Sequence, residues 1–383
     1  MSARIVAGRL LTVALVGTIA TPLLPAQAEA QAKTKSQAPV KLITLDLAVP
    51  DSPALAILGL SPDTVVRPGT PRDLATTVLN GVDRRGNLQA GLAVDMTPLF
   101  LFAGNTLTHA DYAGSRGTQI LGRTQVSVAT AKGTGEGDKA MRLALGLRTT
   151  LWDPGDPRLD AALIDCLDRI PLPPPPGPVT SARARDAWIA KATAERRPAV
   201  EGCHTAFKAR RWNASSFALG IAPSLQSGTG EWDDLTYDGS AVWAALALGL
   251  SGSQVIDGER VERPFGQVVV QARYRDKQLV PDKNTRGRFF EQQAAAVAAR
   301  LVAGAADRAV VIETEFARQD PRSGDSTTSF MLSVGGQLKL TTGTWLSVSA
   351  GGTRGGPANE QRGGFILSSF KWALSREPAV RLP

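Results

Sequence analysis

The residues of this chain that could do acid–base chemistry are two carboxylates one strand step apart, Glu313 and Glu315. They alternate with Ile312, Thr314 and Phe316, and successive side chains of a strand point to opposite faces, so both carboxylates should face the same way. Two carboxylates so placed could serve as general acid and general base. Buried charges need partners, however, so pairing with Arg or Lys on that face is the favoured interpretation.

Other catalytic and metal-binding patterns are scarce. The two histidines, His109 and His204, belong to no metal-type Cys/His spacing. The Gly-rich stretch 133–137 lies between two alternating segments with no helix after it, so a hairpin turn is favoured over a phosphate loop. We therefore predict no catalytic residue, no metal site and no cofactor. A hydrolase that uses luminal carboxylates is kept as the third hypothesis.

The elements that must position these residues have a period of two. In residues 138–152, Met141, Leu143, Leu145 and Leu147 alternate with polar or small residues, and residues 329–340 repeat the pattern. Twelve such segments predict an all-β fold, a transmembrane antiparallel β-barrel of about twelve strands, with a soluble β-sandwich as the alternative. The expected strands are 87–95, 98–107, 118–131, 138–152, 213–225, 238–251, 265–275, 287–303, 308–318, 327–340, 344–352 and 363–374.

The number of strands and the Ala content of one of them bear further on the fold. An even number of strands places both termini on the periplasmic side. Residues 291–306 are so rich in Ala that a helix competes with the strand predicted there.

The ends of the chain divide it further. Arg4 and Arg9 precede an apolar run over 10–24 that ends in overlapping Ala-x-Ala sites, which is typical of a signal peptide. We expect residues 1–30 to be that signal peptide, 31–86 to form a periplasmic or luminal plug-like segment, 87–374 to form the barrel and 375–383 to form a tail. The expected location is the bacterial outer membrane.

A short helix is indicated within the plug-like segment. Thr70 is a candidate N-cap, Pro71 takes the first helical position, Asp73 lies in the first turn and Gly81 follows the end. So short a helix is not stable alone in water, so it should dock in the lumen or at the periplasmic mouth.

Residues 153–212 interrupt the rhythm as a basic, Pro-rich insertion. We expect a helix from Ala182 to Arg197, which Pro198 ends, and a second over 199–211. Cys166 and Cys203 are the only cysteines, so in an oxidising compartment they form one disulfide or remain two free thiols. Counting strands back from the C-terminus places the insertion on the periplasmic side. Its candidate partner-binding residues are Arg183, Arg185, Arg196, Arg197, Arg210 and Arg211.

The side of the strands opposite to the apolar one carries a surplus of positive charge. In a water-filled lumen this surplus would favour anions, whereas in a filled or plugged barrel the same residues would form internal ion pairs. Both interpretations stay open. The expected lumen-lining residues are Arg123, Arg142, Arg148, Arg273, Arg300, Lys339, Lys371, Glu313 and Glu315.

The net charge of +8 allows several partners. Export argues against nucleic acid, so outer-membrane lipid and a periplasmic or surface protein are the expected partners. The leading hypothesis is a non-enzymatic pore for small, anionic solutes. The second is a structural or anchoring barrel that binds a partner through the basic insertion.

One stretch resembles a known group of sequences. The Ser52-Pro53-Ala54 block that runs to Ser61-Pro62, with Arg67-Pro68, Pro71-Arg72-Asp73-Leu74 and Gly81-Val82-Asp83 after it, is similar to the start of uncharacterised bacterial outer-membrane proteins. The resemblance covers about the first third of the mature chain and the general barrel pattern. It implies a fold and a location, and no activity.

Overall fold

The residues described in the computed structural model fall within Thr44–Pro383. The expected signal peptide and the C-terminal tail lie outside the described residues. The described residues are 48–60, 65–68, 71–80, 90–103, 106–132, 141–171, 173–174, 182–229, 231–256, 259–281, 289–305, 307–322, 324–341, 344–355 and 362–372.

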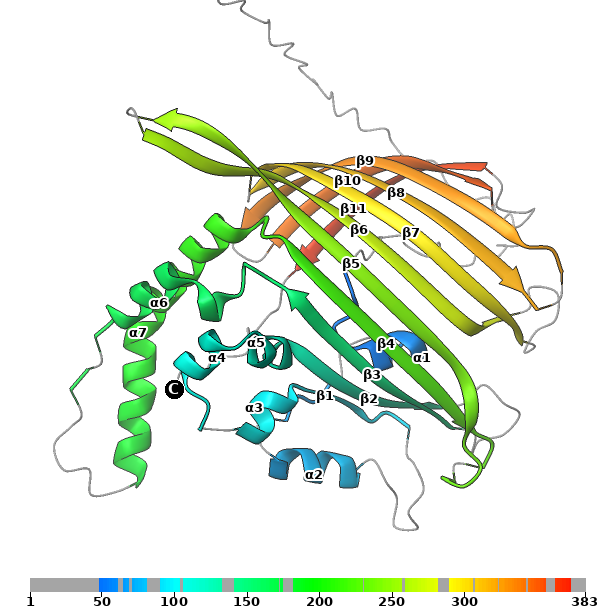
Figure 1. Cartoon of the computed structure of the whole chain (residues 1–383), viewed down its shortest axis with the longest axis horizontal. Coiled ribbons are helices and arrows are strands. Elements are labelled where there is room, and N and C mark those ends of the chain that lie inside the picture. Colours follow the sequence, from blue (N-terminus) through cyan, green and yellow to red (C-terminus); the bar gives the residue numbers. More distant parts are fainter. Residues whose placement is uncertain are drawn as a thin grey trace, which may run out of the picture. The chain divides into compact units, whose positions relative to one another are not determined.

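Eleven antiparallel strands form one sheet, in which each strand pairs with the next along the chain (Figure 1). The all-β prediction is therefore confirmed. Over the described residues β1 and β11 are not hydrogen-bonded to each other, so the sheet is open. The strands are β1 Ala93–Met96, β2 Thr124–Lys132, β3 Met141–Trp152, β4 Ser216–Ser227, β5 Thr236–Ile256, β6 Glu259–Pro281, β7 Phe289–Ala305, β8 Arg308–Pro321, β9 Thr327–Thr341, β10 Thr344–Gly355 and β11 Arg362–Trp372.

The register gives the sheet two chemically different faces. One row of directly opposed residues crosses seven strands and is almost wholly apolar: Leu248, Val268, Leu301, Ile312, Val334, Ala350 and Ile366. Most of these apolar side chains are exposed, for example Val334 at 50%. The neighbouring row on the other face reads Val269, Arg300, Glu313, Ser333, Gly351 and Phe365. We call the first face outer and the second inner.

The sheet curves toward its inner face. Val269 of β6 and Ala298 of β7 pack with Met331 of β9 and Phe365 of β11. Side chains on strands so far apart in the sheet meet only if the sheet bends around them. The curvature is also visible in the ribbon (Figure 1).

The expected strand over 98–107 is wrong. The chain there forms the helix α3, Pro98–Ala103, and then α4, His109–Gly114, and α5, Arg116–Gly122, so α5 also replaces the first part of the expected strand 118–131. Pro98 has no N–H to give to a ladder and fits the first turn of a helix. Thr108 and Asp111 form a capping box that starts α4. The described sheet consequently has eleven strands. An even number of strands therefore no longer supports placing both termini on the periplasmic side.

The Ala-rich segment, in contrast, is a strand, β7. Ala296 and Ala298 are buried on the inner face between their neighbours on β6 and β8. Ala is a good helix former, but here two long neighbouring strands and the curved inner face decide the conformation.

Two short helices precede the sheet. The expected helix is confirmed as α2, Pro71–Asn80, with Asp73 in its first turn. A shorter helix, α1, covers Pro53–Leu58 and ends at Gly59, which adopts a left-handed conformation (φ 71°) that favours glycine. Among the described residues, no helix is long and apolar enough to cross a membrane.

The insertion folds as two helices between β3 and β4, α6 (Ala161–Asp168) and α7 (Ala182–Arg211). The expected break at Pro198 is wrong, because α7 continues through it. Val200 and Phe207 pack on Leu163 and Leu167 of α6, and this packing holds the second half of α7 in place despite the hydrogen bond that proline removes.

The disulfide interpretation of the cysteines is confirmed. Cys166 of α6 and Cys203 of α7 are bonded, with Cα atoms 5.9 Å apart and a separation of 37 positions in sequence. The bond joins the two helices at the centre of their apolar contact, so it closes the insertion into a helical hairpin.

Removing this disulfide should destabilise the hairpin and leave the sheet intact. A loop of this length is worth about 4 kcal/mol in the chain-entropy model. In the double variant Cys166→Ser/Cys203→Ser we expect amide exchange of α6 and α7 to accelerate strongly while that of β5–β9 stays unchanged. Equal acceleration throughout would contradict a local role for the bond.

Candidate functional site

The inner face of β2–β5 holds a segment from the beginning of the described chain. We call residues 48–60, which include α1, the docked segment. Val49, Leu55, Ile57 and Leu58 are buried against this part of the sheet. Burying each such side chain is worth roughly 1.5–3 kcal/mol, so the contact is a stable one. The wall beneath them consists largely of small residues: Ala93, Ala129, Ala131, Ala144, Ala218, Ala222 and Ala241.

Two glycines set how closely the docked segment approaches the wall. A Cβ on Gly146 of β3 would collide with Ser127 Oγ and would lie 2.6 Å from the backbone nitrogen of Ala54. A Cβ on Gly220 of β4 would lie 2.6 Å from Val49 Cγ1. The main chain of the segment therefore rests directly on the strands.

Polar contacts fix the same segment along its length. The N–H of Ala54 donates to Ser127 Oγ at 3.1 Å, and Gln271 Nε2 donates to the carbonyl of Ala48 at 2.7 Å. Arg275 donates to the carbonyl of Ile57. These bonds satisfy backbone groups that a short, isolated helix leaves without partners.

Most of the predicted lumen-lining charges lie on the inner face, and four of the arginines there form ion pairs. Arg142 pairs with Asp238 at 2.6 Å, and Arg148 pairs with Asp51 of the docked segment. Arg300 reaches Glu313 at 2.6 Å, and Arg273 reaches Glu315 at 2.9 Å. Glu313 and Glu315 are therefore charge partners rather than a free acid–base pair.

Two further cations, Arg275 and Lys339, lie on the described part of this face. Arg275 and Lys339 form no ion pair with another described residue; the Lys339 ammonium lies 5.9 Å from the centre of the Trp345 ring. Lys371 lies opposite Trp345 in the register, and its side chain lies outside the described part of the structure. The positive surplus of the inner face thus rests on fewer groups than the sequence indicates.

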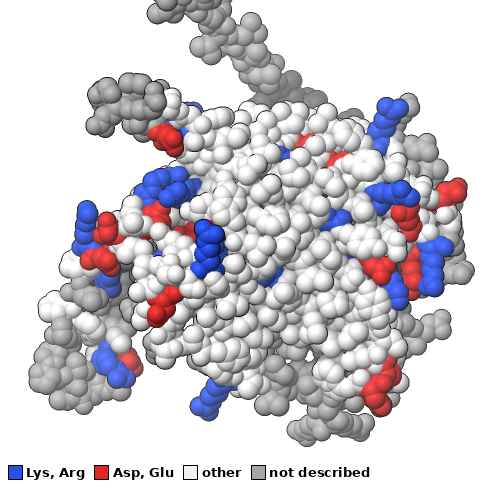
Figure 2. All heavy atoms as spheres, in the orientation of Figure 1, with Lys and Arg blue, Asp and Glu red and all other residues white. Residues whose placement is uncertain are grey.

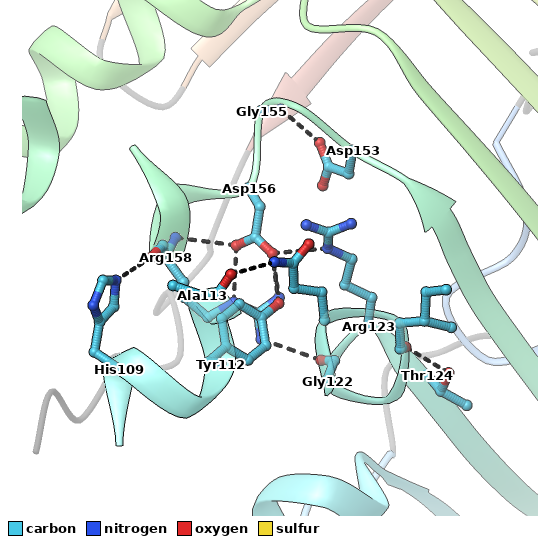
Figure 3. Close-up of polar contacts among 12 residues, drawn as sticks. His109, Tyr112, Ala113, Gly122, Arg123, Thr124, Asp153, Gly155, Asp156 and Arg158 are labelled. Atoms are coloured by element: carbon cyan, nitrogen blue, oxygen red, sulfur yellow. Dashed lines mark hydrogen bonds and ion pairs between the residues drawn. The ribbon is translucent and has the colours of Figure 1, made fainter. Parts of the chain in front are cut away.

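Arg123 is the exception among the predicted lumen-lining residues, because it lies before β2 and outside the sheet. Its Nε donates to Asp156 Oδ2 at 2.8 Å, and Tyr112 Oη donates to the same atom at 2.6 Å (Figure 3). Arg158 donates to Asp156 Oδ1 at 2.8 Å and stacks over the Tyr112 ring at 4.5 Å. Asp156 thereby ties α4, α5 and the loop after β3 together.

Asp156 is 1% exposed, and its environment sets its ionisation. Burial by itself would raise the pKa of Asp156, but hydrogen bonds from Arg158, Tyr112 and Arg123 lower it to about 2. Burial and the hydrogen bond to Asp156 raise the pKa of the Tyr112 phenol above its usual range. The two oxygens of Asp156 are thus shared among Tyr112, Arg123 and Arg158, and the cluster joins α4 and α5 to the loop after β3.

The predicted partner-binding arginines all lie on α7. Arg183, Arg185 and Arg197 are exposed. Arg210 and Arg211, at the end of α7, pair with Asp160 at 2.6 and 3.0 Å. Because Asp160 is the N-cap of α6, these ion pairs join the end of α7 to the start of α6. They serve the insertion's own structure, whereas the first half of the helix presents its charges to solvent.

Sequence reasoning expected a plug-like segment within 31–86 but missed the helix α1 and its contacts with the sheet. The signals for α1 are Ser52-Pro53 at its start, Gly59 at its end and five apolar residues between them. Gly146 and Gly220 are the matching signals on the wall. The partners Asp51 and Asp238 were also missed, since they lie far in sequence from the arginines that they neutralise.

Comparison of this chain with protein-family models, with curated proteins and with solved structures finds no match. The site is therefore interpreted from its own geometry.

Replacing Gly146 should displace the docked segment. A Gly146→Val side chain must push Ala54 away from the wall, which we expect to cost about 1–3 kcal/mol. The control is Gly336→Val on the outer face of β9, where an added Cβ meets only the Ala309 carbonyl at 3.9 Å. In urea unfolding in detergent, the free energy of unfolding should fall for Gly146→Val and stay unchanged for Gly336→Val. An equal fall in both variants would contradict the close contact.

Asp156 should make stability depend on pH in the acid range. Its pKa is about 2 in the folded protein and about 3.9 when unfolded, so the carboxylate stabilises the fold above pH 4 by about 2–3 kcal/mol. That contribution is lost as the pH falls from about 4 through about 2. Unfolding free energy measured across this range should fall less steeply for Asp156→Asn than for the wild type. The variant Asp186→Asn, at an exposed position of α7, should follow the wild type.

Proposed function

We propose that the protein spans the bacterial outer membrane as a β-barrel and conducts small solutes through a polar lumen that its docked segment narrows. The observation that carries the proposal is the difference in polarity between the outer and the inner face of the sheet. Extended rows of exposed apolar side chains on the outer face are unusual for a protein in water and are what lipid requires. The inner face of β6–β10 offers Arg, Glu, Ser and Gln instead.

The surface view agrees with an apolar outer face. Figure 2 shows a broad area without charge over the strands, with Lys, Arg, Asp and Glu gathered mainly toward its margins. In this proposal residues 1–30 direct export, and the strands close into a barrel. Closure removes the free edges, which is required because lipid offers no partners for a strand's backbone groups.

Connection lengths indicate which end of the sheet is periplasmic. At one end the strands are joined by the two-residue connections 257–258, 306–307 and 342–343. The connections at the other end are longer: 133–140, 228–235, 282–288, 322–326 and 356–361. Periplasmic turns of outer-membrane barrels are short, so the first end is assigned to the periplasm. The helical insertion and α3–α5 belong to that same end.

The solute preference follows from the cations that have no carboxylate partner. Since Arg142, Arg148, Arg273 and Arg300 are paired, Arg275 and Lys339 carry the positive surplus of the described inner face. A modest preference for small anions is therefore proposed, rather than the strong one that a ring of free arginines produces.

Planar-bilayer conductance of the refolded mature chain tests this function. We expect discrete steps with a modest anion preference, larger steps for Gly146→Val, and loss of the preference for Lys339→Glu. Arg197→Glu makes the same charge change on α7, outside the sheet, and should leave selectivity unchanged. If neither the wild type nor Gly146→Val shows conductance although both are inserted in the bilayer, the pore is contradicted.

An anchoring barrel is the second candidate, and the disulfide-closed basic hairpin favours it. In this case the lumen stays filled and α7 presents Arg183, Arg185 and Arg197 to a periplasmic protein. Deleting residues 180–211 should then leave the strands folded but abolish co-purification of that protein. Unchanged co-purification, or none in the wild type, contradicts this candidate.

A further inference from the structure

The helices at the periplasmic end carry large apolar side chains in the open. Phe102 of α3 is 68% exposed and Leu121 of α5 is 56% exposed, while Trp152 at the end of β3 is 47% exposed. Phe100 and Leu151 are also exposed. Neither the paired inner face nor the docked segment uses these residues.

Contacts among α3, α4 and α5 position the helices that carry these exposed side chains. Gly122 at the end of α5 leaves room for Tyr112, Leu99 and Phe100, since a Cβ there would lie 2.6 Å from the Tyr112 ring. The Arg158 guanidinium lies 5.2 Å from the Phe100 ring centre and donates to the carbonyl of Gly122 at 3.2 Å. Arg158 is itself bound to Asp156, so its contacts join Phe100 of α3 to Tyr112 of α4 and Gly122 of α5 (Figure 3 shows Arg158 with Asp156, Tyr112 and Gly122). We call α3, α4 and α5 together the layer.

The layer lies where the sheet is shortest. β1 has four residues, whereas a strand needs about 9–11 to cross a bilayer; β2, with nine, only just reaches that length. α3 follows directly on β1, and α5 leads directly into β2. Thr124, the first residue of β2, bonds to Thr149 across the strand pair, so the helices continue the sheet at this edge. Their apolar side chains add exposed apolar surface at the edge where β1 alone is too short to cross a bilayer.

Charge at the same end indicates the kind of surface that this layer meets. Arg116, the first residue of α5, is exposed. Helix α7 carries eight Lys and Arg against three Asp and Glu. Exposed aromatic and aliphatic side chains beside a basic surface fit the headgroup boundary of an anionic bilayer.

We propose that Phe102 and Leu121, together with Leu151 and Trp152, form a membrane-contact patch that inserts at the boundary between headgroups and acyl chains of the periplasmic leaflet. The proposal rests on the outer-membrane function above. It assigns α3–α5 a binding role toward anionic lipid and completes the apolar surface at the short edge of the sheet.

Lipid-quenching of a single label tests the patch. Both native cysteines are in the disulfide, so Phe102→Cys supplies one free thiol for a fluorescent bimane. The full chain is refolded into phosphatidylcholine vesicles, with or without phosphatidylglycerol, that hold spin-labelled lipid with a shallow or a deep nitroxide. We expect the shallow nitroxide to quench the Phe102→Cys label at least about two-fold, and more strongly with phosphatidylglycerol.

Two matched positions separate the outcomes. Ala110→Cys lies on the exposed surface of α4 in the same layer and should be quenched weakly. Leu332→Cys lies on the outer face of β9 and should be quenched by the deep nitroxide. If Leu332→Cys is quenched and Phe102→Cys behaves like Ala110→Cys, the patch is overturned while the membrane proposal stands. If Leu332→Cys is not quenched either, the membrane proposal itself fails.

Discussion

The structure depends on the alternation of side chains along strands that each pair with the next. Because each strand from β1 to β11 pairs with the next, a residue on one face of a strand has its neighbours on the same face of the adjoining strands along each regular stretch of the ladder. The outer row from Leu248 to Ile366 and the inner row from Val269 to Phe365 are direct results. A slip of one residue anywhere would exchange the two faces, so the sheet tolerates only one register.

This constraint also determines what the inner face contains. Arginines and glutamates that point inward need partners, and they find them across neighbouring strands, as Arg300 and Glu313 do, or on the docked segment, as Arg148 does. Where the inner face carries Ala and Gly instead, the docked segment supplies the missing side chains. The inner face thus combines a wall of Ala and Gly under α1 with ion pairs, which lie both beside the docked segment and on β6–β8.

Much of the sheet could be predicted from the sequence, because a period of two reports the strand face directly. The inward positions of Arg142, Arg273 and Glu313 follow from that period, and the pairing of Cys166 with Cys203 follows from their being the only two cysteines. For β7 a helix competed with the predicted strand, because its Ala residues favour a helix whereas pairing with the neighbouring strands favours a strand. The helix α3 was missed because a short apolar run without alternation reads alike as strand and helix.

Contacts between distant residues were beyond sequence reasoning. Arg123 was assigned to the lumen by alternation, but its partner Asp156 lies in a loop whose path the sequence does not determine. Within the expected plug-like segment, α1 was missed because a six-residue helix is too short to show a period, and the small residues opposite it mark where it lies.

The most direct test of the central claim is a thiol-accessibility scan along β8 in vesicles, one Cys at a time, from Val310 to Ala317. If the outer face meets lipid, Val310, Ile312 and Phe316 should be protected from a membrane-impermeant thiol reagent and their labels quenched by lipid nitroxides. Labels at Val311, Glu313 and Ala317 should escape that quenching. Equal behaviour of the two sets, or a protein that stays monodisperse in water without detergent, would contradict a two-faced sheet in a membrane.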